Sequence, residues 1–307
     1  MKEQINISIV IPVYQGEETV RNLIARLYQT LDSLDLAYEI LLIDDGSRDD
    51  SWRIIKEEVE GSNFIKGIKL SRNFGQHNAI SAGLAHAIGK MIVVIDCDLQ
   101  DLPEEITKLY EKALEGYDVV VGQRIKRLDA KTKVWTSKVF YNVFNRFTGL
   151  KFEPGIGNFG IYSEKVINSV LMYQESFRPF PVIVKVVGFK RTGIEIEHAK
   201  RLKGKSNYSG FNLMTGAINT ILYYSHRPIW IFLIGGIGIV AFILFLILGI
   251  TFLTMNISTF QLIIALIILL SFVSLNIALI GIYVSRIFIE TKKRPSYIIE
   301  ELLLNEK

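Results

Sequence analysis

A long stretch without charge constrains this chain more than any other feature. Between Pro228 and Ser285 there is no Asp, Glu, Lys or Arg, although these residues make up 21% of the whole chain. Residues 229–255 and 260–285 are each long enough to cross a bilayer, which takes about 20 apolar residues. The link at 256–259 allows only a tight turn, so we expect a hairpin of two transmembrane helices. A soluble fold would have to bury two such helices completely.

Basic residues at both ends of the hairpin indicate its orientation. His226 and Arg227 precede the first helix, and the turn between the helices carries no charge. The basic residues after the second helix are Arg286, Lys292, Lys293 and Arg294. The positive-inside rule places both flanks in the cytoplasm. We therefore expect a multi-pass protein of the inner (cytoplasmic) membrane, with its N-terminal domain and both termini cytoplasmic.

The net charge and the cysteine content indicate which partners and which compartment to expect. The net charge is only +4, whereas nucleic-acid-binding proteins usually carry a larger, clustered basic charge. We therefore expect no nucleic-acid partner. Cys97 is the single cysteine, which excludes an intrachain disulfide and fits a reducing compartment. The N-terminus runs directly into a strand-like segment, without the basic and apolar regions of a signal sequence.

Before the hairpin, short apolar segments alternate with amphipathic ones. We expect strands at 5–11, 38–43, 65–70, 91–95 and 117–121, and helices at 17–34, 49–60, 76–88 and 103–115. This alternation predicts an α/β domain whose parallel sheet is covered on both faces. The expected organisation is a catalytic domain at 1–210, a juxtamembrane helix at 211–227, two transmembrane helices at 228–286 and a cytoplasmic tail at 287–307. Residues 131–148, which are basic and aromatic, fit either an interfacial helix or a helix packed on the domain.

Acidic residues follow two of the expected strands. In parallel sheets the functional site lies at the carboxyl ends of the strands. Asp96 and Asp98, just after the strand at 91–95, can share one hard cation such as Mg²⁺ or Mn²⁺, which would bridge the phosphates of a nucleotide. The alternative is a capped turn before the helix at 103–115, with Asp101 as the cap.

The segments after two further strands could likewise be either binding sites or plain turns. A carboxylate in the segment Asp44-Asp-Gly-Ser47 can accept hydrogen bonds from a base or ribose, and the segment also suits a plain turn. An aromatic side chain in Pro12-Val-Tyr14 can stack on a base, and a strand-to-helix turn explains this segment equally well. His77 is the histidine nearest a motif, with packing as its alternative role.

An ordered set of motifs resembles a known family. The motifs are Ile11-Pro-Val-Tyr14, Asp44-Asp-Gly-Ser47, Ser71-Arg-Asn-Phe-Gly75, Asp96-Cys-Asp-Leu-Gln-Asp101 with Pro103-Glu104, and Gly122-Gln-Arg124. Together they resemble glycosyltransferase family 2, in its dolichyl-phosphate-mannose synthase branch with the bacterial bactoprenol (polyprenyl-phosphate) glycosyltransferases. The resemblance runs from residue 5 to about residue 210, and the bacterial members also carry two C-terminal membrane helices.

The resemblance implies a GT-A (Rossmann-like) fold and a set of site residues. Pro12, Tyr14, Glu17 and Asp44 would line the nucleotide pocket, with Asp45 and Arg72 near it. Asp96, Asp98 and Gln100 would surround the metal and the diphosphate, and Arg124 would face the phosphates. Arg201 with Gly204-Lys205-Ser206-Asn207-Tyr208 resembles the Arg-x-x-Gly-x-Ser-Lys-Tyr loop that closes over the diphosphate. The relatives also suggest a homo-oligomer packed through the membrane helices.

The chain departs from the family pattern around the expected sugar and acceptor positions. Gln15-Gly16-Glu17 replaces Asn-Glu-Glu, and Asn207 replaces a lysine. Gly157-Asn158-Phe159-Gly160-Ile161 replaces Gly-Asp-Phe-Arg-Leu, so the candidate base at position 158 is an amide. A phosphate acceptor is already ionised at neutral pH and needs no base, whereas an alcohol acceptor does.

These observations predict a hexosyltransferase-like enzyme that is metal-dependent and inverting. It would move a sugar from a nucleotide-sugar donor to polyprenyl (undecaprenyl) phosphate at the cytoplasmic face. One alternative is transfer to a hydroxyl of a lipid-linked or growing glycan, for which Asp101 or Glu153 would be the local candidates for the base. The other is a catalytically inactive membrane scaffold, which the changes at 158 and 160 favour and the intact Asp96 and Asp98 oppose.

Overall fold

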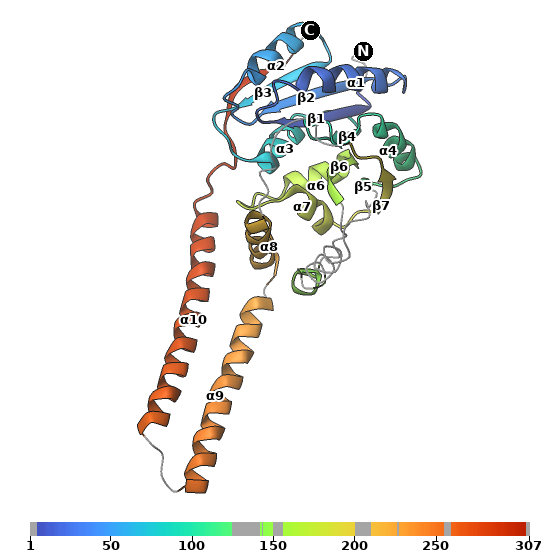
Figure 1. The fold of residues 1–307 in the computed structure, drawn as a ribbon. Helices are drawn as coiled ribbons and strands as arrows, with labels where there is room; N and C mark the ends of the chain where they lie inside the picture. Colours follow the sequence, from blue (N-terminus) through green and yellow to red (C-terminus); the bar gives the residue numbers. More distant parts are fainter. Residues whose placement is uncertain are drawn as a thin grey trace. The chain divides into compact units, whose positions relative to one another are not determined.

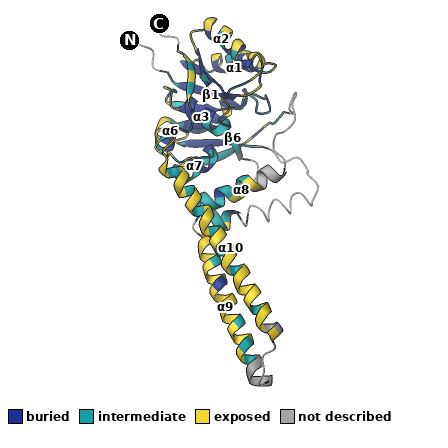
Figure 2. Ribbon diagram, turned by 90° about the vertical axis from the view of Figure 1, so that its left-hand side faces the viewer, coloured by how far each residue is buried: buried dark blue, intermediate teal, exposed yellow. Residues whose placement is uncertain are grey.

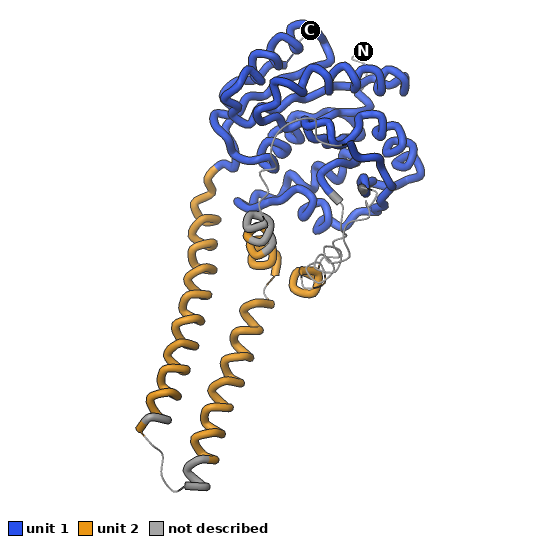
Figure 3. Tube along the Cα trace, viewed as in Figure 1, with its two compact units in different colours: residues 1–141, 150–207, 295–307 blue, residues 142–149, 208–294 orange. Residues whose placement is uncertain are grey.

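The computed structural model describes residues 5–124, 142, 144–149, 156–199, 210–225, 227–254 and 259–304. The chain forms two compact units, coloured separately in Figure 3. Unit 1 comprises Met1–Tyr141, Leu150–Asn207 and Pro295–Lys307, and unit 2 comprises Asn142–Gly149 and Tyr208–Arg294. The segment that follows the hairpin therefore belongs to the same unit as the N-terminal domain.

Unit 1 is built on one mixed sheet of eight strands in the order β7-β5-β6-β4-β1-β2-β3-β8 (Figure 1). The strands are β1 (Ile7–Val13), β2 (Tyr38–Asp44), β3 (Ile65–Leu70), β4 (Met91–Val94), β5 (Val119–Arg124), β6 (Ile156–Ser163), β7 (Arg191–Ile196) and β8 (Ile299–Leu303). Strands β4, β1, β2 and β3 run parallel to one another, as do β5 and β7. Strand β6 is antiparallel to both of its neighbours, and β8 is antiparallel to β3.

Helices cover both faces of this sheet and divide its core into two hydrophobic clusters. The helices of unit 1 are α1 (Val20–Asp32), α2 (Ser51–Glu60), α3 (Gln76–Leu84), α4 (Glu105–Leu114), α6 (Glu164–Leu171) and α7 (Phe180–Val186). Helices α1, α2 and α4 contribute to one cluster, and α3, α6 and α7 to the other. Side chains of β1 alternate between the clusters: Ile9 and Ile11 enter the first and Val10 the second. This double burial explains why the strand is a continuous apolar run from residue 9 to residue 13.

The expected α/β class is confirmed, and so is each helix and strand expected between residues 5 and 121. The expectation of a parallel sheet is confirmed for β1 to β4 and is wrong for β6 and β8, which run antiparallel to their neighbours. The alternation of strand and helix ends after β5, so it carried no information on β6. Strand β8 lies after the hairpin, where no local pattern connects it to its partner β3, more than 200 residues earlier in the chain.

The C-terminal segment is part of the sheet rather than only a tail. The backbone N–H of Ser71 donates to the carbonyl of Ile298 at 2.9 Å, at the end of the β3–β8 pairing. Trp52 Nε1 donates to Glu301 at 3.0 Å, and Lys56 forms an ion pair with the same carboxylate at 2.7 Å. The side chain of Leu303 packs against the first core cluster. Strand β8 therefore covers the edge that β3 would otherwise expose.

Unit 2 contains the three long apolar helices α8 (Gly210–Tyr224), α9 (Arg227–Thr254) and α10 (Thr259–Thr291). Residues 227–249 of α9 and 262–291 of α10 are long and apolar enough to cross a membrane. Figure 2 shows that most described residues of these two helices are exposed. A Cβ added at Gly236 would lie 2.0 Å from the ring of Phe272, so this glycine permits close contact of α9 and α10. The remaining apolar surface requires a cover, which a lipid bilayer would provide.

Deleting residues 295–307 is expected to destabilise unit 1 by about 3 kcal/mol or more, because it uncovers β3 and removes the packing of Tyr297, Ile299 and Leu303. Thermal unfolding of the purified protein in detergent measures this. Glu300→Gln is the control, since it removes only the exposed ion pair with Lys69 and should cost about 0–1 kcal/mol. Equal unfolding midpoints for the truncated and full chains would contradict the structural role of β8.

Candidate active site

Three neighbouring strands bring the expected acidic segments to one edge of the sheet. Val13 of β1 lies beside Asp44 of β2 in the parallel register. On the other side of β1, Val10 pairs with Val94 of β4, and the N–H of Ile95 donates to the carbonyl of Val10 at 3.2 Å. Asp96 follows immediately. The segments after β1, β2 and β4 therefore start from the same sheet edge, as the sequence predicts.

The loops after β1 and β2 are held together by hydrogen bonds. The N–H of Gln15, a residue with φ of +53°, donates to Ser47 Oγ at 3.0 Å. The N–H of Asp50 donates to the carboxylate of Glu17 at 2.9 Å, just before α2 begins. Glu17 thus stabilises the start of α2. Two other expected pocket residues differ in exposure, since Pro12 is buried within β1 whereas Tyr14 is 38% exposed and can meet a ligand.

The two carboxylates at the end of β2 are buried and have different partners. Asp44 accepts a hydrogen bond from the N–H of Ser47 at 3.3 Å, within its own turn. Asp45 accepts from the N–H groups of Phe74 and Gly75, at 2.7 and 2.9 Å. Burial raises the pKa of both carboxyl groups above the usual range for aspartate, and the hydrogen bonds oppose this rise. Asp45 therefore holds the loop between β3 and α3.

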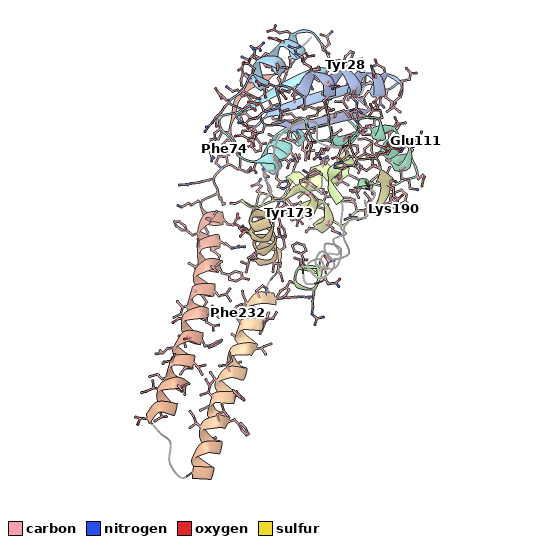
Figure 4. The ribbon with its side chains drawn as sticks, viewed as in Figure 1. Tyr28, Phe74, Glu111, Tyr173, Lys190 and Phe232 are labelled. Atoms are coloured by element: carbon pink, nitrogen blue, oxygen red, sulfur yellow. The ribbon has the colours of Figure 1, made fainter. Side chains whose placement is uncertain are left out.

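Close backbone contact reinforces this link. Gly46 has a φ of +67°, and a Cβ added there would lie 2.4 Å from the carbonyl carbon of Arg72. The guanidinium of Arg72 lies 4.1 Å from the ring centroid of Phe74, which is labelled in Figure 4. The loop that carries Arg72 is thus fixed against the end of β2. This contact explains the glycine of the Asp-Asp-Gly-Ser segment, since only glycine combines this φ with this separation.

The segment after β4 carries the expected metal ligands. The side-chain Nε2 of Gln76, the first residue of α3, donates to Asp96 Oδ1 at 2.7 Å. Asp98 Oδ1 accepts from the N–H of Gln100 at 3.1 Å across Leu99, whose φ is +58°. Cys97 points into the protein, and burial together with the two acids raises the pKa of its thiol to about 12. The cysteine is therefore a packing residue and not a nucleophile.

The donor chemistry of this segment fits a divalent cation. In the part of the chain that the structure describes, no group of three or more His, Cys, Asp or Glu is placed to hold a metal. Asp96 and Asp98 offer hard oxygen ligands, and Mg²⁺ is commonly bound by one or two carboxylates together with substrate phosphates. The site therefore suits a metal that is held jointly by the protein and a bound nucleotide.

Asp101 does not cap the following helix, so that alternative is wrong. The N-cap of α4 is Glu104, and Asp101 is buried with its Oδ1 3.3 Å from Nδ1 of His198. Residues Asp101 and His198 also form an isolated β-bridge. The contact ties the Asp96–Asp101 segment to the chain that follows β7.

Packing explains one of the changed residues of β6, Gly160. The hydroxyl of Tyr162 donates to the carbonyl of Asn158 at 3.0 Å. A Cβ added at Gly160 would lie 2.7 Å from the carbonyl oxygen of Val120 and 3.0 Å from the Tyr162 hydroxyl. Tyr162 therefore fills the space that a side chain at position 160 would need. Burial raises the pKa of Tyr162, so its hydroxyl stays neutral.

The remaining residues expected at the site either have a packing role or lie partly or wholly outside the described residues. Burial lowers the pKa of His77 to about 4, and its Nδ1 accepts from the N–H of Phe180 at 3.4 Å, which is a packing role. Arg124 ends β5 beside Ile196, and its side chain lies outside the described residues. The residues that fall outside the described ranges altogether are Arg201, Lys205, Ser206, Asn207, Tyr208 and Glu153, with most of 131–148. Gln76 was not expected at the site, although its position directly after the Ser71–Gly75 motif marks it.

Comparisons with known proteins agree on one family. The model of glycosyl transferase family 2 matches residues 8–171. An uncharacterized glycosyltransferase of Synechocystis sp. is 34% identical over 97% of this chain and 96% of its own length. The undecaprenyl-phosphate 4-deoxy-4-formamido-L-arabinose transferase of Shewanella sediminis is 33% identical over 98% of this chain and 93% of its own length.

Among solved structures, glucosyl-3-phosphoglycerate synthase from Mycobacterium tuberculosis, in complex with Mn²⁺, uridine diphosphate and phosphoglyceric acid, has a TM-score of 0.48 and 18% identity. The match covers 71% of this chain and 76% of that chain. The family match and the mixed sheet together confirm the expected GT-A fold class.

Gly46→Ala is expected to lower the free energy of unfolding by about 3 kcal/mol or more, through a backbone clash and left-handed strain, and to weaken nucleotide binding by displacing the Arg72 loop. Gly188→Ala is the matched control. It has a similar φ of +77° and its nearest contact is at 3.8 Å, so it should cost only about 1–2 kcal/mol. Thermal unfolding and calorimetric titration with nucleoside diphosphates distinguish the two variants. Equal effects of both substitutions would disprove the close contact between Gly46 and the backbone of Arg72.

Proposed function

This chain belongs to glycosyl transferase family 2, and on that basis we propose that it moves a sugar from a nucleotide-sugar donor to polyprenyl (undecaprenyl) phosphate at the cytoplasmic membrane face. The observation that carries the proposal is the position of Asp96 and Asp98. They follow β4 at the sheet edge where the β1 and β2 loops also begin, and Gln76 holds Asp96 in place.

We assign the donor site to three groups of residues. Tyr14 stacks on the base, with Pro12, Glu17, Asp44, Asp45 and Arg72 forming or supporting the nucleotide pocket. Asp96, Asp98 and Gln100 would hold Mg²⁺ or Mn²⁺, which would supply positive charge to stabilise a departing diphosphate. Arg124 and the segment with Arg201, Lys205, Ser206 and Tyr208 bind the same phosphates.

The chemistry of the acceptor accounts for the absence of an acid at position 158. A lipid phosphate is ionised at neutral pH, so its oxygen can attack the anomeric carbon in line, with inversion and without a general base. The relative from Shewanella sediminis, whose name states that it acts on undecaprenyl phosphate, supports this acceptor. A hydroxyl acceptor would require a base, and the described candidate, Asp101, is buried against His198.

The fold supports the proposed membrane topology. Strand β8, after the second candidate span, pairs with β3, which precedes the first span. Because both strands belong to one sheet, we propose that the chain enters the membrane at the first span and leaves it after the second span on the same side. The basic residues flanking the hairpin favour the cytoplasm as that side. Anchoring the enzyme there raises the effective concentration of an acceptor that stays in the membrane.

A transfer assay tests the proposal directly. Purified protein in detergent receives polyprenyl phosphate, Mg²⁺ or Mn²⁺ and a panel of nucleotide sugars, and lipid products are identified by mass spectrometry. We expect a polyprenyl-phosphate monosaccharide that is lost with EDTA. Metal-dependent nucleotide binding without this product would favour a lipid-linked glycan as the acceptor, and no nucleotide binding would favour a scaffold.

Asp98→Asn is expected to lower the transfer rate about 100-fold or more, because it removes one of two charged metal ligands from the leaving-group site. Asp35→Asn, an exposed turn residue with φ of +50°, makes the same chemical change away from the site and should leave the rate unchanged. Rates are measured with the donor sugar that the transfer assay identifies. A folded Asp98→Asn protein with full activity would rule out the metal role.

A further inference from the structure

A cavity in unit 2 is lined by none of the residues assigned to the donor site. It has a volume of about 700 Å³ and lies between the end of α8 and the last turns of α10. Tyr223, Ser225, Tyr283, Arg286, Ile287 and Lys293 are among the residues that line it. Its walls thus combine two cations, the carboxylate of Glu290 and three phenol rings with apolar side chains.

Arg286 is held in position by α8. Its guanidinium carbon lies 4.2 Å from the ring centroid of Tyr223, and its Nη2 donates to Asn219 Oδ1 at 3.2 Å. A guanidinium has five N–H donors in a planar fork, and this arrangement fixes the plane of that fork. The donors not used by Asn219 suit a planar or tetrahedral oxyanion that enters the cavity.

Tyr283 adds a polar group with no partner. Its hydroxyl is buried and, among the residues that the structure describes, has no hydrogen-bond partner. It lies one turn before Arg286 on α10, so both side chains face the same wall of the cavity. Buried hydroxyls are normally satisfied, so a ligand atom that accepts from this hydroxyl would complete the site.

The position of the cavity along α10 identifies the class of ligand. The apolar span 262–291 ends here and the basic residues Lys292, Lys293 and Arg294 follow, which is the pattern of a helix reaching the headgroup level. On the N-terminal side of the cavity the surface of α10 is apolar and exposed, for example at Ile277 and Ile280, and Figure 2 shows most of this helix as exposed. A ligand with a phosphate head and a long apolar chain matches both regions.

We propose that this cavity binds the phosphate of the polyprenyl-phosphate acceptor, with Arg286, Lys293 and the Tyr283 hydroxyl as its ligands and the polyprenyl chain lying along α10. The inference rests on the proposed function for the identity of the lipid. A phosphate monoester carries about −1.5 to −2 charges at pH 7, against one for a phospholipid diester. Two cations therefore favour the monoester, even though Glu290 also lines the cavity.

The test uses two adjacent lysines as a matched pair. Lys293 lines the cavity, whereas Lys292 lies with its Nζ 4.0 Å from the ring centroid of Phe288 and does not line it. Each change to Gln removes one charge from the same membrane surface. Lys293→Gln and Arg286→Gln should raise the KM for polyprenyl phosphate about tenfold without changing the KM for the donor, and Lys292→Gln should change neither. Arg286→Lys should restore part of the loss.

Direct binding separates this inference from the proposed function. Polyprenyl phosphate or phosphatidylglycerol is added to the full chain in detergent, and bound lipid is counted by native mass spectrometry. Weaker polyprenyl-phosphate binding in Arg286→Gln and Lys293→Gln supports the site even if no sugar is transferred. Normal transfer with equal KM values in all variants overturns it. Equal retention of phosphatidylglycerol also overturns it, because the cavity would then hold bulk lipid.

One further variant guards against misfolding. Tyr283→Phe removes a single oxygen that has no partner in the described protein, so it should not reduce stability. It is expected to weaken polyprenyl-phosphate binding about threefold. Unchanged binding in this variant would show that the Tyr283 hydroxyl is not a ligand. The roles of Arg286 and Lys293 would then be decided by their own variants.

Discussion

The hydrogen bonds that Asp45 accepts from the backbone of Phe74 and Gly75 are the interaction on which the site depends. They join the end of β2 to the loop before α3, although burial disfavours the carboxylate charge. That loop ends at Gln76, whose side chain then donates to Asp96 after β4. The two acidic segments are therefore connected through one short loop. A substitution at Asp45 should therefore displace Asp96, and the reverse, because each connection between them is a partly buried hydrogen bond.

The sequence was sufficient for features that depend on local periodicity or on strand ends. Double burial gives β1 and β2 continuous apolar runs at 9–13 and 40–43. The carboxylates Asp44 and Asp96 could be placed at one edge because parallel strands end together. The sequence was insufficient where the same residue could serve either as a helix cap or in a tertiary contact. Asp101 has the spacing of a helix cap but is buried against His198, which comes from a segment almost 100 residues later. Strand β8 was missed for the same reason, since its partner is distant in sequence.

The unusual residues of β6 are consistent with one another. Position 160 lacks a side chain because Tyr162 and the carbonyl of Val120 occupy the space, and the Tyr162 hydroxyl is satisfied by the carbonyl of Asn158. Gly160 and Tyr162 thus pack as a pair, and this pairing explains the missing side chain at position 160. Asn158 takes part only through its backbone carbonyl, so the structure does not explain the amide side chain at position 158.

The place of β8 in the sheet also fixes an order of events during synthesis. Strand β3 is made early, with only Lys66 and Lys69 to discourage pairing with other chains, and Lys69 acquires its partner Glu300 only with the last residues. The ribosome must release both apolar helices before β8 exists. The sheet can thus reach its full width only after both candidate membrane spans have emerged, so completion of the catalytic unit is tied to their synthesis.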